Sequence, residues 1–279
     1  MLDYKIGTDV MQDNTQHMMK RQYRGYILAT FVLSLCSHGV HIVSEMSQSW
    51  VVAVTVPECH ISYGLYQGSM VCGNTSDEAM LSITCLLYLN VCAWSCEGHP
   101  QDDIQELYNS GKLLHSCSNT TQDVALPVLL VRERFINGVA WLATVVAVVL
   151  SGLASLIALI LTVYNVNHTP SCYWLSIRGL YLWFGSCCVL KSLSLATWGI
   201  EFYFNLSRNM GTVDTIVGLL DSNGKAHLGY SYWTQLIVIA LQCCCMALLY
   251  YRETLFDKRP SFVGSRQRQN NYLGYVNYV

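Results

Sequence analysis

Apolar residues are gathered into four long segments of the chain, separated by polar stretches. A helix that crosses a lipid bilayer needs roughly 20 predominantly apolar residues, and each segment reaches or approaches this length. The pattern therefore predicts an all-α membrane protein, a bundle of four transmembrane helices. The predicted helices cover residues 26–43, 138–164, 179–202 and 230–251.

The first apolar segment, Tyr26–Val43, is short and contains His38 and His41. A cleaved signal peptide is the alternative for it, but a long polar stretch precedes it and Val43-Ser44-Glu45 offers no small-x-small cleavage site. We therefore interpret it as a transmembrane helix. A fifth apolar stretch, Met80–Trp94, is too short to span a bilayer, and we expect it to be buried loop structure.

Composition supports contact with membrane lipid. Only 12 % of the residues are charged and 52 % are apolar, whereas a typical soluble domain has about 25 % charged residues. The net charge is −2 and no run of Lys and Arg alternates with aromatic residues, so nucleic acid is not expected as a partner. No Ser-His-Asp order, Walker loop, His-Glu-x-x-His or dinucleotide-binding glycine pattern occurs, so we expect neither an enzyme nor a bound cofactor.

Basic residues beside the predicted helices set the orientation, because cytosolic segments carry an excess of Lys and Arg. Both ends of the chain are rich in them, so we expect both termini in the cytosol of a cell whose plasma membrane holds the protein. Arg132 and Arg134 precede the second helix on the outer side and run against this orientation. The expected cytosolic segments are 1–25, 165–178 and 252–279, and the expected extracellular loops are 44–137 and 203–229.

The larger extracellular loop holds six of the thirteen cysteines. The exoplasmic compartment is oxidising, so disulfides are expected there. Six cysteines allow fifteen pairings, of which Cys59–Cys72 is the one we predict. For Cys92-x-x-x-Cys96, with His99 and His115 nearby, a zinc site is the alternative to a bridge.

Glycosylation sequons test the same topology. Asn74-Thr75-Ser76 and Asn119-Thr120-Thr121 lie in the large loop, where the transferase would reach them. Asn205 is also outside but too close to the membrane for efficient glycosylation. Asn167 falls in the inner loop and should remain unglycosylated. We therefore expect Asn74 and Asn119 to carry glycans.

The beginning of the large loop has the composition of a sheet. Residues 51–56 read VVAVTV, Pro57 follows, and residues 61–66 read ISYGLY. Val, Ile, Thr and Tyr favour a pleated surface, whereas Pro and Gly interrupt one. We predict two short strands, with Tyr63–Gly73 (YGLYQGSMVCG) forming the second strand and its disulfide anchor. The loop would then be a small, disulfide-bonded β platform.

These residues resemble a known family. Trp50 after the first helix, followed by a Gly-Leu-aromatic step and two cysteines, resembles the claudin superfamily of four-helix membrane proteins, and its clarin branch more closely. The start of the third helix, Gly179-Leu180-Tyr181-Leu182, also looks like clarins. The resemblance covers the four helices and the start of the outer loop but not residues 74–133. The residues that resemble the clarin Tyr-Gly-Leu-Phe-x-Gly…Cys-Gly signature are Tyr63, Gly64, Leu65, Tyr66, Gly68, Cys72 and Gly73.

Resemblance to clarins implies a protein that organises membrane domains in sensory cells and at synapses, linked to the actin cytoskeleton. Other members of the superfamily act as auxiliary subunits of ion channels or as cell-junction proteins, and both functions are alternatives here. The outer loop would then bind a channel or adhesion partner, and self-association into a homo-oligomer stays open.

The last residues of the chain, Asn277, Tyr278 and Val279, resemble the Tyr-Val ending that is common in claudins. A PDZ domain captures such a tail as an added strand and holds its carboxylate in a backbone nest. We therefore predict a PDZ-domain scaffold as the cytosolic partner.

Among the polar side chains inside the predicted helices, Lys191, Gln242 and His38 are the candidates for a functional role. A charge there is costly unless it is paired or reaches the interface. On one interpretation they mark a polar path or a partner contact; on the other they make hydrogen bonds that fix how the helices pack. No carboxylate falls within the cores of the predicted helices, so we expect no proton relay or catalytic dyad.

Overall fold

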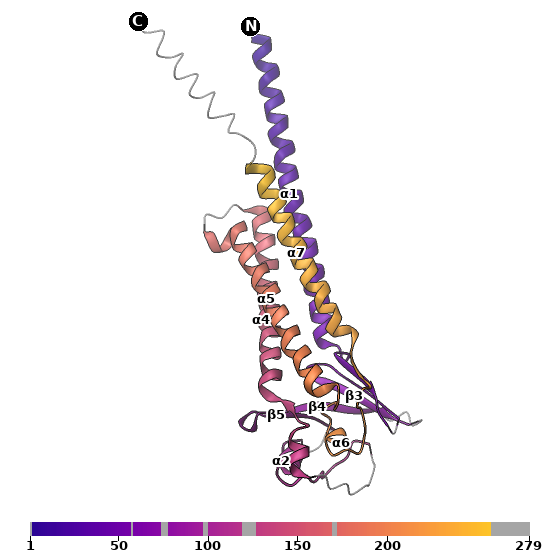
Figure 1. Ribbon diagram of the computed structural model, residues 1–279. Coiled ribbons are helices and arrows are strands. Elements are labelled where there is room, and N and C mark those ends of the chain that lie inside the picture. Colours follow the sequence, from indigo (N-terminus) through magenta and orange to yellow (C-terminus); the bar gives the residue numbers. More distant parts are fainter. Residues whose placement is uncertain are drawn as a thin grey trace.

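The computed structural model describes residues 2–56, 58–73, 78–96, 100–118, 127–168 and 172–257. It is a bundle of four long helices that carries a sheet domain at one end (Figure 1). α1 begins and α7 ends at the opposite end of the bundle. The long helices are α1 (Leu2–Met46), α4 (Gly138–Asn167), α5 (Ile177–Glu201) and α7 (Tyr230–Asp257).

Each long helix contains a stretch that is long and apolar enough to cross a membrane, so by length and composition the chain is a multi-pass membrane protein. Apolar side chains on the outer surface of α4 are about half exposed, as expected of positions that face lipid; Val149, Leu153 and Ile160 are examples. The four candidate spans are Arg24–Met46, Gly138–Val166, Ile177–Leu206 and Tyr230–Leu255.

The helices form a ring in which each packs against two neighbours. α1 lies between α7 and α4, and α5 lies between α4 and α7. α1 and α5 are therefore diagonal to each other across the bundle. Asn137 begins α4 by accepting hydrogen bonds through its side chain from the N–H groups of Val139 and Ala140, at 3.0 and 3.1 Å, which satisfies donors that the first turn leaves unpaired.

The sheet domain is built on seven strands in the order β6-β5-β4-β3-β2-β1-β7, and every neighbouring pair is antiparallel, giving a half-barrel. The first six strands come from the segment between α1 and α4, and β7 comes from the segment between α5 and α7. β7 pairs with β1, with Leu228 opposite Val51, so the two segments complete one sheet. The strands are β1 (Val51–Val54), β2 (Cys59–Tyr63), β3 (Gln67–Cys72), β4 (Glu78–Leu86), β5 (Val91–Cys96), β6 (Ile136–Asn137) and β7 (Ala226–Leu228).

Short helices fill the spaces around the sheet. Figure 1 shows α2 at the far side of the sheet domain from the bundle. These elements are η1 (Leu87–Leu89), α2 (Pro100–Ser110), α3 (Val128–Arg132), the π-helical turn η3 (Phe202–Leu206) and α6 (Val213–Ile216). Another short helix, η2 (Tyr173–Leu175), lies between α4 and α5 at the opposite end of the bundle.

The sheet is larger than the sequence predicted. The stretch Tyr63–Gly73 is not one strand, because Tyr63 ends β2, the Gly64 N–H donates to the Gln67 carbonyl at 2.8 Å, and β3 follows. The stretch Met80–Trp94, expected as buried loop, forms most of the β4–β5 hairpin. Its apolar side chains supply the inner face of the sheet, where Leu81 and Trp94 are buried, and this explains an apolar run too short to span a bilayer.

Candidate functional site

The tryptophan that follows α1 joins the sheet to the bundle. Trp50 is fully buried, and its indole N–H donates to the Ser44 carbonyl of α1 at 2.9 Å. Its ring meets Trp198 of α5 and Tyr232 of α7 edge to face, with ring centroids 6.3 Å apart in both cases. One side chain therefore contacts three of the four helices.

The motif residues Tyr63 and Leu65 are also fully buried. The Tyr63 ring stacks on Trp94 with centroids 4.6 Å apart, and its hydroxyl donates to the Met210 carbonyl at 2.9 Å. Burial, with a smaller contribution from the nearby Glu201 carboxylate, raises the pKa of Tyr63 well above its ordinary value. These side chains pack in the interior of the sheet domain and are not accessible to a partner.

The motif glycines allow backbone segments to approach closely. A Cβ on Gly64 would collide with the Ser47 carbonyl oxygen, and one on Gly68 would lie 2.5 Å from the Tyr63 Cβ. Gly73 has a positive φ of 65°, which glycine adopts without steric cost. Tyr66, by contrast, is 38 % exposed, so the aromatic residue of the Gly-Leu-aromatic step is the accessible part of the motif.

Three disulfides join the cysteines of the sheet domain: Cys59–Cys72, the pair expected from the sequence, together with Cys85–Cys92 and Cys96–Cys117. The first two connect directly opposed residues of neighbouring strands, in β2–β3 and β4–β5.

The disulfides argue against the zinc alternative, because neither Cys92 nor Cys96 keeps a free thiolate. His115 instead places its Nδ1 3.1 Å from the Asp103 carboxylate, and His99 lies outside the described residues. In the part of the chain that the structure describes, no three His, Cys, Asp or Glu side chains are grouped to hold a metal ion.

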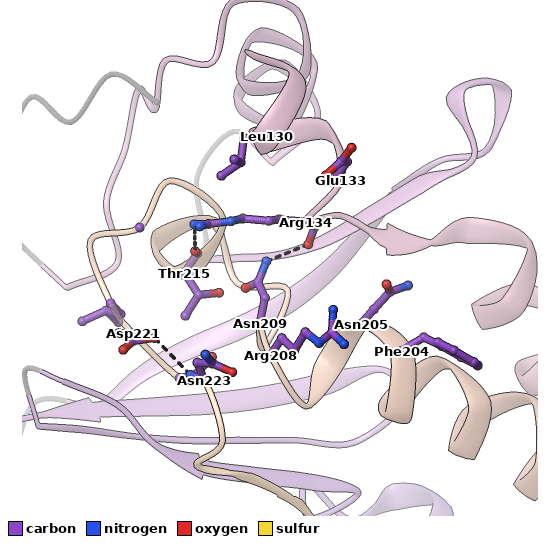
Figure 2. Close-up of a pocket in the computed structure, with 13 residues that line it drawn as sticks. Leu130, Glu133, Arg134, Phe204, Asn205, Arg208, Asn209, Thr215, Asp221 and Asn223 are labelled. Atoms are coloured by element: carbon purple, nitrogen blue, oxygen red, sulfur yellow. Dashed lines mark hydrogen bonds between the residues drawn. The ribbon is translucent and has the colours of Figure 1, made fainter. Parts of the chain in front are cut away.

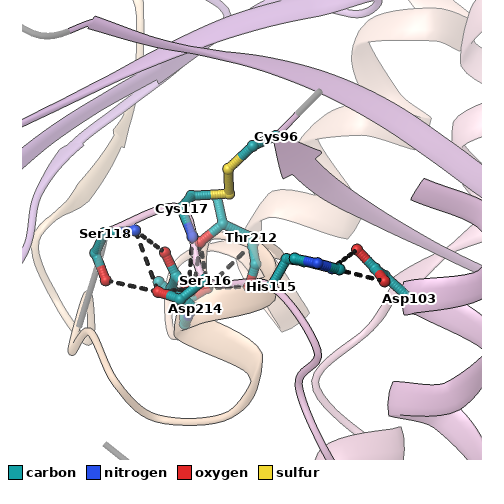
Figure 3. Close-up of a disulfide and its surroundings, with 9 residues drawn as sticks. Cys96, Asp103, His115, Ser116, Cys117, Ser118, Thr212 and Asp214 are labelled. Atoms are coloured by element: carbon teal, nitrogen blue, oxygen red, sulfur yellow. Dashed lines mark hydrogen bonds and ion pairs between the residues drawn. A yellow bond between two sulfur atoms is a disulfide. The ribbon is translucent and has the colours of Figure 1, made fainter. Parts of the chain in front are cut away.

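A buried carboxylate holds the third disulfide in place (Figure 3). Asp214, at the start of α6, accepts a hydrogen bond from the Ser116 hydroxyl at 2.8 Å and from the N–H groups of Cys117 and Ser118 at 3.2 and 2.9 Å. Burial raises the pKa of Asp214, and these hydrogen bonds oppose the rise. The contact ties the segment before α4 to the segment after α5.

A polar cavity of about 700 Å³ lies where these same two segments meet (Figure 2). Arg134 crosses it and donates to the carbonyls of Thr215 and Ile216 at 3.4 and 3.3 Å. The Asn209 amide donates to the Arg134 carbonyl at 2.8 Å, and Arg208 also lines the cavity. Small-molecule sites of this volume are mostly apolar. This cavity is polar and its lining residues hydrogen-bond to one another, so we assign no ligand to it.

The arginines that ran against the expected orientation have local roles. Arg132 donates through Nε to the Tyr108 carbonyl at 3.1 Å and lies over the Tyr108 ring, 4.6 Å from its centroid. Together with Arg134 in the cavity, it holds the sheet domain together, so these charges need not act as an orientation signal.

A charged cluster lies within the bundle near its sheet end. Lys191 of α5 is fully buried and places its Nζ 2.9 Å from Oε1 of Glu45 on α1. His41, one turn before Glu45, places its Nδ1 2.7 Å from the same oxygen. The His41 ring fits against Gly152 of α4, where an added Cβ would lie 2.7 Å from Nε2. We call His41, Glu45 and Lys191 the intramembrane cluster.

Glu45 was not among the residues expected inside the bundle, because the predicted first helix ended at Val43. No glycine or proline follows Gly39 in α1, so the helix continues past the apolar run to Met46 and turns Glu45 toward Lys191 across the bundle. The i, i+4 spacing of His41 and Glu45 places both on one helix face, and this was the sequence signal that could have revealed the pair.

The other polar side chains inside the helices also contact neighbours. Gln242 of α7 is fully buried and donates to the hydroxyls of Ser37 on α1 and Ser155 on α4, at 2.9 and 3.4 Å. The His38 ring lies 6.2 Å from that of His41, centroid to centroid. For Lys191 and Gln242 these contacts favour the interpretation that they fix helix packing.

Several predicted sites fall outside the described residues: the sequon asparagines Asn74 and Asn119 and the tail residues Asn277, Tyr278 and Val279. Comparison of the chain with protein-family models and with curated proteins finds no match.

Proposed function

We propose that this protein is a clarin-like organiser of plasma-membrane domains, which binds partners through its sheet domain outside the cell and through its C-terminal tail inside. The observation that carries the proposal is that both segments on the sheet side of the bundle fold into one disulfide-bonded domain. Such a domain, fixed to all four helices, suits a membrane protein that holds other molecules in place.

The proposed orientation has the sheet domain outside and both termini in the cytosol. Disulfides persist in oxidising compartments, and the sheet domain contains three. The basic residues of segments 1–25 and 252–279 favour the cytosolic side for the other end of the bundle. An epitope inserted after Asn119 should bind antibody on intact cells, and one at the N-terminus should bind only after permeabilisation; the reverse would refute the orientation.

Proximity labelling from each side of the membrane tests the proposed function. The labelling enzyme is placed at the N-terminus for the cytosolic side, because a PDZ domain needs a free C-terminal carboxylate, and after Asn119 for the outer side. We expect PDZ-domain scaffolds among the cytosolic partners and adhesion or matrix proteins among the outer ones. Pore-forming subunits on both sides would favour the auxiliary-subunit function instead, and strands of protein between cells that express only this chain would favour a cell-junction function.

The tail is tested by a substitution that preserves its length. Val279→Asp places a charge where a PDZ pocket takes an apolar side chain, so it should disperse the protein from its membrane domain and remove PDZ scaffolds from the cytosolic labelling. Asn270→Ala, upstream of the three tail residues, is the matched control and should leave both unchanged. Normal clustering of the Val279→Asp protein would refute the tail interaction.

The auxiliary-subunit alternative comes from the resemblance to the superfamily, and Lys191 was the residue whose substitution would test it. Its ammonium is fully buried and bound to Glu45 of the same chain, which leaves no surface there for a partner. We therefore do not propose this function for the protein.

A further inference from the structure

The tip of the β4–β5 hairpin presents apolar side chains beside the bundle. The tip is η1, where Leu87 is 50 % and Tyr88 70 % exposed. Figure 1 shows this hairpin reaching sideways past the sheet-side end of α4. Two adjacent exposed apolar residues at a hairpin tip need an explanation, since Leu86 and Val91 on either side of the tip are buried.

The tip is held rigidly at the level where α4 begins. The Asn90 carbonyl accepts from the Gly138 N–H at 3.1 Å, and the Asn90 side-chain oxygen accepts from the Val139 N–H at 2.7 Å. The Cys85–Cys92 disulfide closes the hairpin directly behind the tip. Because Gly138 is the first residue of a candidate membrane span, the tip is fixed at the edge of the bilayer.

The exposed surface of the tip continues into that of the bundle. Val139, in the first turn of α4, is 61 % exposed and belongs to the side of the helix that would face lipid. At the sheet-side ends of α5 and α7, Tyr203 is 71 %, Phe204 63 % and Tyr230 63 % exposed. Exposed aromatic residues gather at the level of the lipid headgroups, and Tyr88 adds to this belt from the sheet.

We infer that the β4–β5 tip inserts Leu87 and Tyr88 into the adjacent lipid leaflet and anchors the sheet domain to the membrane surface beside the bundle. Leu87 enters the acyl region, and Tyr88 keeps its hydroxyl among the headgroups while its ring is in apolar surroundings. Lipid is the occupant because the tip is continuous with the lipid-facing side of α4. The anchor fixes the tilt of the sheet domain relative to the membrane, independently of which partner the domain binds.

Photo-crosslinking of the purified full chain in bilayers of alkyne-tagged phosphatidylcholine tests this inference. A benzophenone-bearing amino acid replaces Tyr88, Val139 as the lipid-facing reference, or Gln105 on α2, an exposed position away from the bundle. We expect the Tyr88 position to form lipid adducts at a yield close to that of Val139 and severalfold above that of Gln105. A yield equal to that of Gln105, or a crosslink to a second copy of the chain in place of lipid, would overturn the inference.

A second variant separates insertion from mere proximity. Leu87→Asp introduces a charge at an exposed site and should lower the lipid-adduct yield at Tyr88 severalfold while leaving the disulfide pattern intact. Leu114→Asp is the matched control, because Leu114 is 56 % exposed in the same domain but lies outside the tip. An unchanged yield with Leu87→Asp would also overturn the inference. The proposed cellular function does not enter this experiment, so either can fail alone.

Discussion

At the scale of single residues, the cost of burying charge explains the arrangement inside the bundle. Glu45 shares one oxygen between Lys191 and His41, so each group has a partner where water is scarce. Taking away one member of a buried ion pair costs far more than replacing both, because it leaves an uncompensated charge. Removing one member of the intramembrane cluster should therefore lower the stability of the protein far more than removing one member of an exposed ion pair.

We predict that Glu45→Gln lowers the stability of the purified protein by roughly 3–5 kcal/mol, because it leaves Lys191 buried without its ion-pair partner. The double variant Glu45→Gln with Lys191→Met should recover most of the loss, since it removes the unpaired buried amine. Unfolding followed by tryptophan fluorescence in detergent checks both. A double variant no more stable than the single one would contradict the buried pairing.

A second residue-scale prediction concerns pH. Burial raises the pKa of Asp214 above its ordinary value of 3.8, so the folded state binds its proton more tightly than the unfolded state does. This contribution to stability is complete below pH 3.8 and is lost as pH rises through the folded-state pKa. The stability of the wild type relative to Asp214→Asn should therefore fall from acidic toward neutral pH. Melting curves of the two proteins across this range check it, and a relative stability of the wild type that rises with pH would refute it.

At the scale of elements, the four helices could be predicted because their length and apolar composition leave few alternatives. The sheet could be predicted only in part. Composition predicted β1 and β2. The apolar run that forms β4 and β5 was interpreted as buried loop, because an apolar run alone does not show whether it forms strands of a sheet. The pairing of β7 with β1 joins residues more than 170 positions apart, with Leu228 opposite Val51, and no local pattern encodes that contact.

The contact between Ser47, the residue after α1, and the β2–β3 turn gives an element-scale prediction. Gly64→Ala forces a Cβ against the Ser47 carbonyl, and such overpacking costs about 1–3 kcal/mol. Gly39→Ala on α1 is the matched control, because a Cβ there meets nothing within 4 Å. Thermal unfolding of the two purified variants should separate them clearly. Equal melting temperatures would mean that the close approach at Gly64 is not required.

At the scale of the whole molecule, the two segments on the sheet side depend on each other. Met210 and Leu220 of the second segment join Trp50 and Tyr63 of the first in one buried cluster. Asp214 reaches from the second segment to the loop that carries Cys117. The domain can therefore be completed only after the second segment has been made.

This dependence predicts how a truncated chain will oxidise. A chain that ends at Leu206 lacks Asp214 and should fail to form Cys96–Cys117 efficiently. Cys59–Cys72 and Cys85–Cys92 should still form, because each joins opposed strands of one hairpin. Peptide mapping by mass spectrometry without reduction distinguishes the three bridges. Full formation of Cys96–Cys117 in the truncated chain would show that Asp214 does not guide it.

Each long helix runs directly into the sheet domain: α1 leads to β1, β6 leads to α4, α5 leads to η3, and β7 leads to α7. A pulling force on this domain is consequently shared among four helices in the membrane. One helix cannot leave the membrane while the other three stay in place unless the sheet domain unfolds. A tether between two cells or between a cell and its matrix would gain tensile strength from this shared load, beyond what a single-span adhesion molecule could bear.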